Sequence, residues 1–224
     1  MAVTESGGTP DRIGQAAPQF TAAAVRRALD AAISGVGPFP GAARAAEKIH
    51  NAADGEEIES VRELIDAHVR MAAAQGLVTN LGGLVTATVA IPANLAGLAF
   101  IQLRLTAGIL HLRGYDLTDS RVHNAILATL LGEPKLLELL RQHKVPATPM
   151  AIATAPVEDP QLGLVLANEA AAELLTRVGG KHLATAVARR VPLVGGVFGA
   201  STDAYWTWQA GRYADREFLS RKRR

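Results

Sequence analysis

The sequence contains no cysteine and very few aromatic residues. Among its 224 residues, Phe, Trp and Tyr together make up only 4%. The absence of cysteine excludes disulfides, thiol catalysis and thiolate metal sites. Because 49% of the residues are hydrophobic, a core has to be built mainly from Ala, Leu, Val and Ile. Ala and Leu are strong helix formers, whereas strands prefer β-branched and aromatic residues, so this composition favours helices.

The sequence also lacks a large excess of either charge. Lys and Arg number 23 against 21 Asp and Glu, and the last four residues, 221–224, are all basic. The high pI is therefore a property of this tail, and no basic stripe elsewhere indicates nucleic-acid binding. Residues 1–20 are rich in Gly, Pro, Ser and Thr and have no signal-peptide pattern. We expect a disordered start and a cytoplasmic protein.

Helical periodicity dominates the rest of the chain. It is clearest over residues 56–74, where apolar positions recur three and four residues apart and the charged positions lie opposite. Residues 145–160 contain four prolines and are predicted to form a linker. No period-2 strand is evident. We therefore predict an all-α fold over residues 21–220, a single compact domain of about eight to ten helices with an apolar central hairpin. The other predicted helices are 21–33, 42–52, 76–90, 92–113, 118–131, 132–144, 161–190, which Gly179 and Gly180 interrupt, and one from 192 onward.

Charged residues are missing from a long internal stretch. Residues 71–103 form a run of 33 residues without a charged side chain, and Pro92 divides this run into two helices. The run is long enough to span a bilayer, but it contains Asn80, Asn94 and several threonines and glycines. A helix that is apolar on all sides belongs in a protein core or in a membrane. The sequence thus leaves open a buried hairpin, a spanning segment and a segment at the lipid interface.

Familiar catalytic and nucleotide-binding motifs are missing as well. VGGVFG, residues 194–199, lacks the lysine of a Walker A loop and the spacing of a dinucleotide fingerprint. No serine lies in G-x-S-x-G, and the histidines lack the H-E-x-x-H spacing of zinc proteases. We predict no catalytic residue, no metal and no cofactor. Gly195, Gly196 and Gly199 instead have the small-residue spacing that lets two helices pack closely.

Two charged residues interrupt the apolar segments. Arg104 follows the uncharged run, and Asp203 lies in the apolar segment near the C-terminus. Because a buried ion must be paired, we expect Arg104 to contact a carboxylate, with Asp203 the leading candidate and Asp116 or Asp119 the others. The first interpretation is a core salt bridge that fixes the register of two helices. The alternative is an enzyme with a polar site around Arg104, His111, Asp116 and Asp203.

Aromatic residues gather shortly before the basic tail. Tyr and Trp favour places that are apolar on one side and wet on the other, and nearby basic residues attract anionic lipid. These residues are therefore candidates for membrane or lipid contact, unless the aromatic rings only supply bulk to an alanine-rich core. The candidates are Tyr205, Trp206, Trp208, Arg221, Lys222, Arg223 and Arg224.

Four stretches of the sequence resemble the EcsC family in its actinobacterial-type form. They are GVGPFPGA (35–42), HVRMAAAQGLVTNLGGLVT (68–86), IPANLAGLAFIQLRLTAGILHLRGYD (91–116) and RRVPLVGGVFGASTDAYWTWQAGRYADREF (189–218). The resemblance covers about residues 25 to 218, implies a helical domain and assigns no catalytic residue. The family takes its name from a gene associated with an ABC transporter.

The resemblance also implies a set of positions that form the signature of the fold. The aromatic YWTW that follows Asp203 departs from the plainer residues of the family, which bears on whether this element makes the same contact in every member. The implied positions are Pro92, Leu95, Gln102, Arg104, Gly114, Tyr115, Asp116, Pro192, Gly196, Asp203 and Gly211.

These observations together predict a non-enzymatic bacterial protein that associates with a membrane surface, most simply an anionic one, or binds lipid. A membrane protein such as a transporter is a further predicted partner. We expect a cytoplasmic protein at the inner face of the membrane, with the basic tail tuning its attachment. The alternatives are a soluble adaptor, dimeric through the glycine-rich helix, and an enzyme with the polar site described above.

Overall fold

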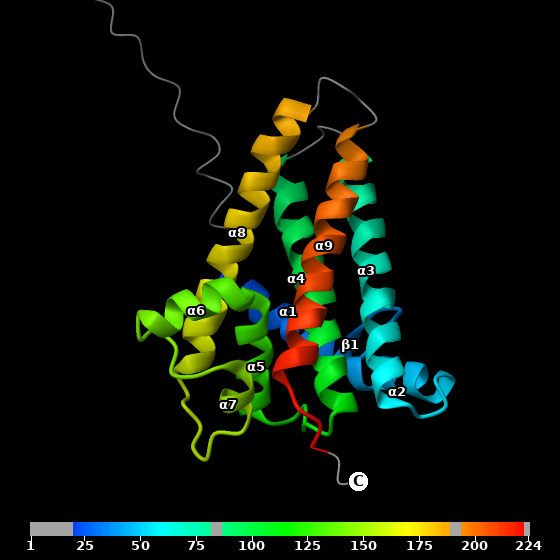
Figure 1. Ribbon diagram of the computed structural model, residues 1–224. Coiled ribbons are helices and arrows are strands. Elements are labelled where there is room, and N and C mark those ends of the chain that lie inside the picture. The colour runs from blue at the N-terminus through cyan, green and yellow to red at the C-terminus, as the bar shows by residue number, and fades with distance from the viewer. Residues whose placement is uncertain (1–19, 82–86, 189–193, 222–224) are drawn as a thin grey trace, which may run out of the picture.

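The computed structural model describes residues 20–81, 87–188 and 194–221, and these residues form an all-α fold (Figure 1). The predicted fold class is thereby confirmed, with nine helices and one two-stranded hairpin in the described ranges. The helices are α1 (Ala22–Ser34), α2 (Ala42–Ala52), α3 (Glu57–Leu81), α4 (Ala87–Leu112), α5 (Ser120–Leu131), α6 (Glu133–Arg141), α7 (Pro149–Ala153), α8 (Leu162–Ala188) and α9 (Val194–Glu217), and the strands are β1 (Gly35–Val36) and β2 (Phe39–Pro40).

Helix α4 is the central helix of the fold. It contacts α1, α2, α3, α5, α8 and α9. Among the described residues, its segment Asn94–Leu112 is long and apolar enough to cross a membrane, and 78% of that segment is buried inside the protein. A helix that is apolar on all sides is suited to this position, because every face meets another helix. The segment Asn94–Leu112, which belongs to the predicted apolar hairpin, thus lies in the core of the domain.

Four long helices, α3, α4, α8 and α9, stand side by side and extend beyond the shorter ones (Figure 1). The chain runs upward in that view along α3 and α8 and downward along α4 and α9. The C-terminal ends of α3 and α8 therefore lie at the same end of the molecule as the N-terminal ends of α4 and α9. The short helices α2, α5, α6 and α7 surround the opposite end.

Several predicted boundaries differ from the structure. Helix α4 begins at Ala87, so Pro92 lies inside it instead of opening a helix, and α8 continues through Gly179 and Gly180. Helix propensity is a local preference that tertiary context routinely overrides. The predicted proline-rich linker contains the short helix α7. The hairpin β1–β2 was not predicted; it forms where Gly35 and Gly37 adopt positive φ angles of 96° and 54°.

The amphipathic pattern of α3 is confirmed. Val61, Leu64 and Ile65 are buried, as the three- and four-residue spacing predicts. Ile58 was placed on the same face, but its side chain is 86% exposed. It lies in the first turn of the helix.

Residues of the turn after α4 bind the C-terminal end of α9 and the residues that follow it. Arg113 donates from Nη1 to the carbonyl oxygens of Asp215 and Phe218, and its Nη2 lies 2.5 Å from the Asp215 carboxylate. The backbone N–H of Arg221 donates to the carbonyl of Arg113 at 2.8 Å, and its guanidinium lies 5.4 Å from the centre of the Tyr115 ring. The start of the basic tail is therefore held beside the C-terminal ends of α4 and α9.

Candidate functional site

The predicted pairing of Arg104 with a carboxylate does not occur among the described residues. The side chain is buried, its Nε donates to the carbonyl of Pro40 at 3.1 Å, and Nη1 lies 3.5 Å from His68 Nε2. Asp203 is buried too but has interactions of its own, and Asp116 is exposed. The physical reason is that Arg104 faces the side of α4 covered by the hairpin and α3.

His68 is a neutral partner for this guanidinium. Its Nδ1 lies 2.8 Å from the carbonyl of Leu64, which can only accept, so Nδ1 carries the proton and Nε2 is left with a lone pair. Burial lowers the pKa of His68 from 6.5 to about 4, against a raising effect of the Leu64 bond, and the charge of Arg104 lowers it further. Burial also lowers the pKa of Arg104, although a guanidinium stays charged in proteins.

This histidine makes the stability of the fold depend on pH. Below pH 6.5 His68 becomes protonated in the unfolded chain, whereas in the native state it stays neutral down to about pH 4. The free energy of unfolding therefore decreases as the pH falls through this window. We expect the free energy of unfolding, measured in urea, to be about 2 kcal/mol lower at pH 5 than at pH 7. The variant His68→Gln should lose most of this difference, whereas replacement of the surface residue His111 should leave it intact. Equal pH dependence of the wild type and His68→Gln would contradict the assignment.

The other predicted polar residues have separate surroundings. His111 Nε2 lies 3.0 Å from Glu47 Oε1, in a surface pair whose side chains are 31% and 60% exposed. Within the described ranges, no group of three His, Asp or Glu side chains is placed to hold a metal. Arg104, His111, Asp116 and Asp203 therefore do not form one polar site in this fold.

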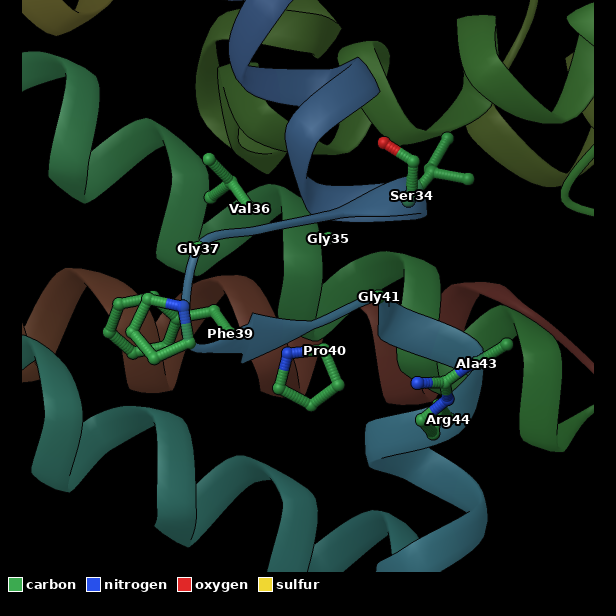
Figure 2. Close-up of a pocket in the computed structure, with 11 residues that line it drawn as sticks. Ser34, Gly35, Val36, Gly37, Phe39, Pro40, Gly41, Ala43 and Arg44 are labelled. Carbon is green, nitrogen blue, oxygen red and sulfur yellow. The ribbon is translucent and has the colours of Figure 1, made fainter.

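An open pocket of about 560 Å³ lies beside the hairpin. Figure 2 shows its wall, made of the end of α1, the β1–β2 hairpin and the start of α2, with Val36 and Phe39 on the left of the view and Ser34 and Arg44 on the right. Phe39 packs edge-on against Phe100 of α4, with ring centroids 5.9 Å apart. Arg104 is not part of the lining, so the pocket is separate from the buried guanidinium.

The three candidate aromatic residues of α9 lie together. Tyr205 and Trp208 are 52% and 47% exposed, and their rings are stacked with centroids 6.4 Å apart. The Trp206 ring packs edge-on against Tyr205 and carries the guanidinium of Arg177 from α8, 4.8 Å from its centre. Tyr205 and Trp208 are thus about half exposed on the surface of α9 and do not fill the core.

The structure separates these aromatic residues from the basic tail, which the sequence had suggested as one patch. Nine residues of helix, about 13 Å, lie between Trp208 and the end of α9, and Arg221 is held still further along, against Arg113. Lys222, Arg223 and Arg224 lie outside the described residues. The tail therefore starts at the end of the molecule opposite the first turns of α9 (Figure 1).

A close helix contact occurs at Gly211. A Cβ atom added there would lie 2.8 Å from Ile65 Cγ1 and 3.0 Å from Leu105 Cδ2, so only glycine lets α3, α4 and α9 meet at this point. The predicted close-packing positions Gly195, Gly196 and Gly199 lie in the first turns of α9, and their surroundings are outside what the structure describes. Only the family resemblance pointed to Gly211.

The long helices share one feature that sequence reasoning missed. No Asp or Glu occurs between Asp66 and Asp116 or between Glu173 and Asp203. These two segments contain the parts of α3, α4, α8 and α9 that extend together beyond the shorter helices (Figure 1). We refer to three of these parts, residues 71–81 of α3, 87–103 of α4 and 194–202 of α9, as the uncharged end, because none contains a charged residue. The adjoining part of α8 contains Lys181.

Comparisons with protein-family models, with curated proteins and with solved structures give no match. The resemblance to the EcsC family therefore stays a prediction from the sequence. The features of this chain that bear on its function are the uncharged end and the exposed aromatic pair.

Proposed function

We propose that this protein is a non-enzymatic helical protein that attaches peripherally to an anionic membrane surface through its uncharged end. The observation that carries the proposal is the position of three uncharged helix ends side by side at one end of the molecule. The cytoplasmic leaflet, with its anionic lipids, is the proposed partner surface. The rest of the helical fold stays in water.

The helix ends themselves support this proposal. A helix end in water is usually surrounded by charged side chains, acidic near the N-terminus and basic near the C-terminus. Here the first turns of α4 and α9 contain no acidic residue, and the last turns of α3 and α8 contain no basic residue. Helix ends without charge are suited to a lipid environment, where each charged side chain is costly.

The charge distribution supports an anionic partner. The acid-free segments still contain basic residues beside the uncharged end, among them Arg70 of α3, Arg177 and Lys181 of α8. Each basic residue near an anionic membrane contributes about 1 kcal/mol of attraction, which salt screens within a Debye length. No carboxylate of these segments opposes the attraction.

The test is flotation of the full-length protein with vesicles of phosphatidylcholine alone and with added phosphatidylserine, at low and high salt. We expect flotation with the anionic vesicles and a smaller bound fraction at high salt. A chain that ends at Ser220 should bind equally well, because the tail starts at the opposite end of the fold. Absence of flotation with either vesicle would overturn the proposal in favour of a soluble adaptor, and the oligomeric state in solution would then be measured.

A further inference from the structure

We propose that the open pocket beside the β1–β2 hairpin binds a small organic anion, whose carboxylate or phosphate group meets Arg44 and whose apolar body lies against Val36 and Phe39. All lining residues of this pocket belong to the segment 33–44, which the structure describes without a gap. The segment lies outside the uncharged end, so the inference goes beyond the proposed function and does not rest on it.

The two ends of the pocket differ in chemistry. Figure 2 shows Val36 and Phe39 at one end, and Ser34 and Arg44 at the other. The apolar end is accessible to a ligand, because Val36 is 51% and Phe39 is 43% exposed. At the other end, the Ser34 hydroxyl donates to the carbonyl of Asp30, so the Arg44 guanidinium is the side-chain donor that remains for a ligand. A molecule with an apolar body and one polar group matches this division.

The charge of the pocket favours an anion. Arg44 is the one charged residue among those that line it, and it is exposed and forms no ion pair with a described residue. The acidic residues nearest to the lining along α1 and α2 are Asp30 and Glu47. Neither lines the pocket, and Glu47 pairs with His111. A guanidinium presents parallel N–H donors that match two oxygens of a carboxylate or a phosphate. An anion can therefore bind Arg44 without displacing an existing partner.

The start of α2 and a buried charge add to the positive potential around Arg44. Helix α2 starts beside the pocket with Gly41 as its N-cap, which has no side chain to bind the first N–H groups, and its first turn contains no acidic residue. On the α4 side of the hairpin, the Arg104 guanidinium binds the carbonyl of the lining residue Pro40 and pairs with no described carboxylate. A charge held away from water acts over a longer distance than a charge at the surface. Both features favour negative charge in the pocket.

The hairpin wall is held in place in the free protein. Arg104 Nε donates to the Pro40 carbonyl at 3.1 Å, and the Phe39 ring packs edge-on against Phe100 with ring centroids 5.9 Å apart. Both contacts join β2 to α4, the central helix. A wall that is already fixed loses less conformational freedom when a ligand binds. The pocket volume of about 560 Å³ also falls within the range of ligand sites, roughly 300 to 1,000 Å³.

The experiment titrates the full-length, ¹⁵N-labelled protein with phenyl phosphate, benzoate, inorganic phosphate and benzyl alcohol. The backbone amide signals of Gly35, Gly37 and Gly41, which line the pocket, report binding there by NMR. We expect saturable shifts of these signals with the two aromatic anions and none with the neutral benzyl alcohol. Inorganic phosphate should bind at least about tenfold more weakly than phenyl phosphate, because it has no apolar body to cover Val36 and Phe39.

Matched variants test the two ends of the pocket. Arg44→Gln should weaken the binding of phenyl phosphate at least about tenfold, because the charge-assisted bond to the phosphate is lost. Lys48→Gln removes a charge from the same face of α2, one turn further along and outside the lining, and should change the affinity less than about twofold. Val36→Ser should weaken the binding of phenyl phosphate and leave that of inorganic phosphate unchanged. Circular dichroism of each variant verifies that the fold is intact.

Three results would overturn the inference. The first is the absence of saturable shifts at the glycine signals with both phenyl phosphate and benzoate. The second is equal affinity of the wild type and Arg44→Gln for phenyl phosphate. The third is an equal loss of affinity in Arg44→Gln and Lys48→Gln, which would show a general attraction of anions to α2 and no site at the pocket. Vesicle flotation tests other residues, so each of these results leaves the proposed function standing.

Discussion

Replacing Arg113 by alanine is expected to lower the free energy of unfolding by about 3 to 5 kcal/mol, the usual effect of removing one partner from a nearly buried ion pair. The Arg113 side chain is 12% exposed, and it binds the Asp215 carboxylate and the carbonyl oxygens of Asp215 and Phe218. Its loss leaves these acceptors without their charged donor, in a place that water reaches poorly. Urea unfolding followed by circular dichroism measures the effect.

The matched control is Arg212, which pairs with the same carboxylate from the surface. Its Nη1 lies 3.2 Å from Asp215 Oδ2, and its side chain is 48% exposed. Because exposed ion pairs contribute little, Arg212→Ala should change the free energy of unfolding by less than about 1 kcal/mol. Equal effects of the two substitutions would show that the end of α9 does not depend on the Arg113 contacts.

Replacing Tyr205 and Trp208 together by serine is expected to weaken binding to anionic vesicles about a hundredfold. Transferring an aromatic side chain into the interface contributes at least about 1.4 kcal/mol, which corresponds to a factor of ten for each residue. Both side chains are about half exposed in the free protein, so the substitutions should leave the fold stable. Vesicle titration with the bound fraction measured by sedimentation gives the affinity.

A control pair of exposed apolar residues lies away from the uncharged end. Ile58 in the first turn of α3 and Val157 after α7 are 86% and 77% exposed. Their double replacement by serine removes exposed apolar surface of the same kind and should leave the vesicle affinity unchanged. An equal loss in both double variants would mean that binding follows general surface hydrophobicity and not the aromatic pair of α9.

The fold class could be predicted from the sequence because it depends on composition and period. An alanine- and leucine-rich chain with few aromatics favours helices, and the spacing of Val61, Leu64 and Ile65 identified the buried face of α3. The start of α5 follows the usual capping preference. The Asp119 carboxylate accepts from the backbone N–H of Arg121, as expected of an N-cap.

The partner of Arg104 could not be predicted, because its strongest contact is a backbone atom. A carboxylate is the partner that a sequence suggests for a buried guanidinium, since side-chain charges are visible in it. The guanidinium instead binds the carbonyl of Pro40, 64 residues away, together with a neutral histidine. Which backbone oxygens face a buried donor depends on how the hairpin packs, and no local pattern encodes that position.

The candidate site was recognised only in part for a similar reason. The uncharged run of residues 71–103 and the aromatic residues near position 205 were both visible in the sequence. That they lie on neighbouring helices was not, because this depends on the contact among α3, α4 and α9 at Gly211. The aromatic residues were instead assigned to the basic tail, their neighbour along the chain.

The extensive packing of α3 against α9 also determines when the protein can fold during its synthesis. The two helices are separated by about half of the chain. Contacts between such distant segments form late, because the intervening chain must first be made and closed into a loop. On the ribosome, the apolar face of α3 therefore stays without its partner until α9 has been synthesised. Nascent chains of this protein are for that reason expected to depend on chaperones that bind exposed apolar helices.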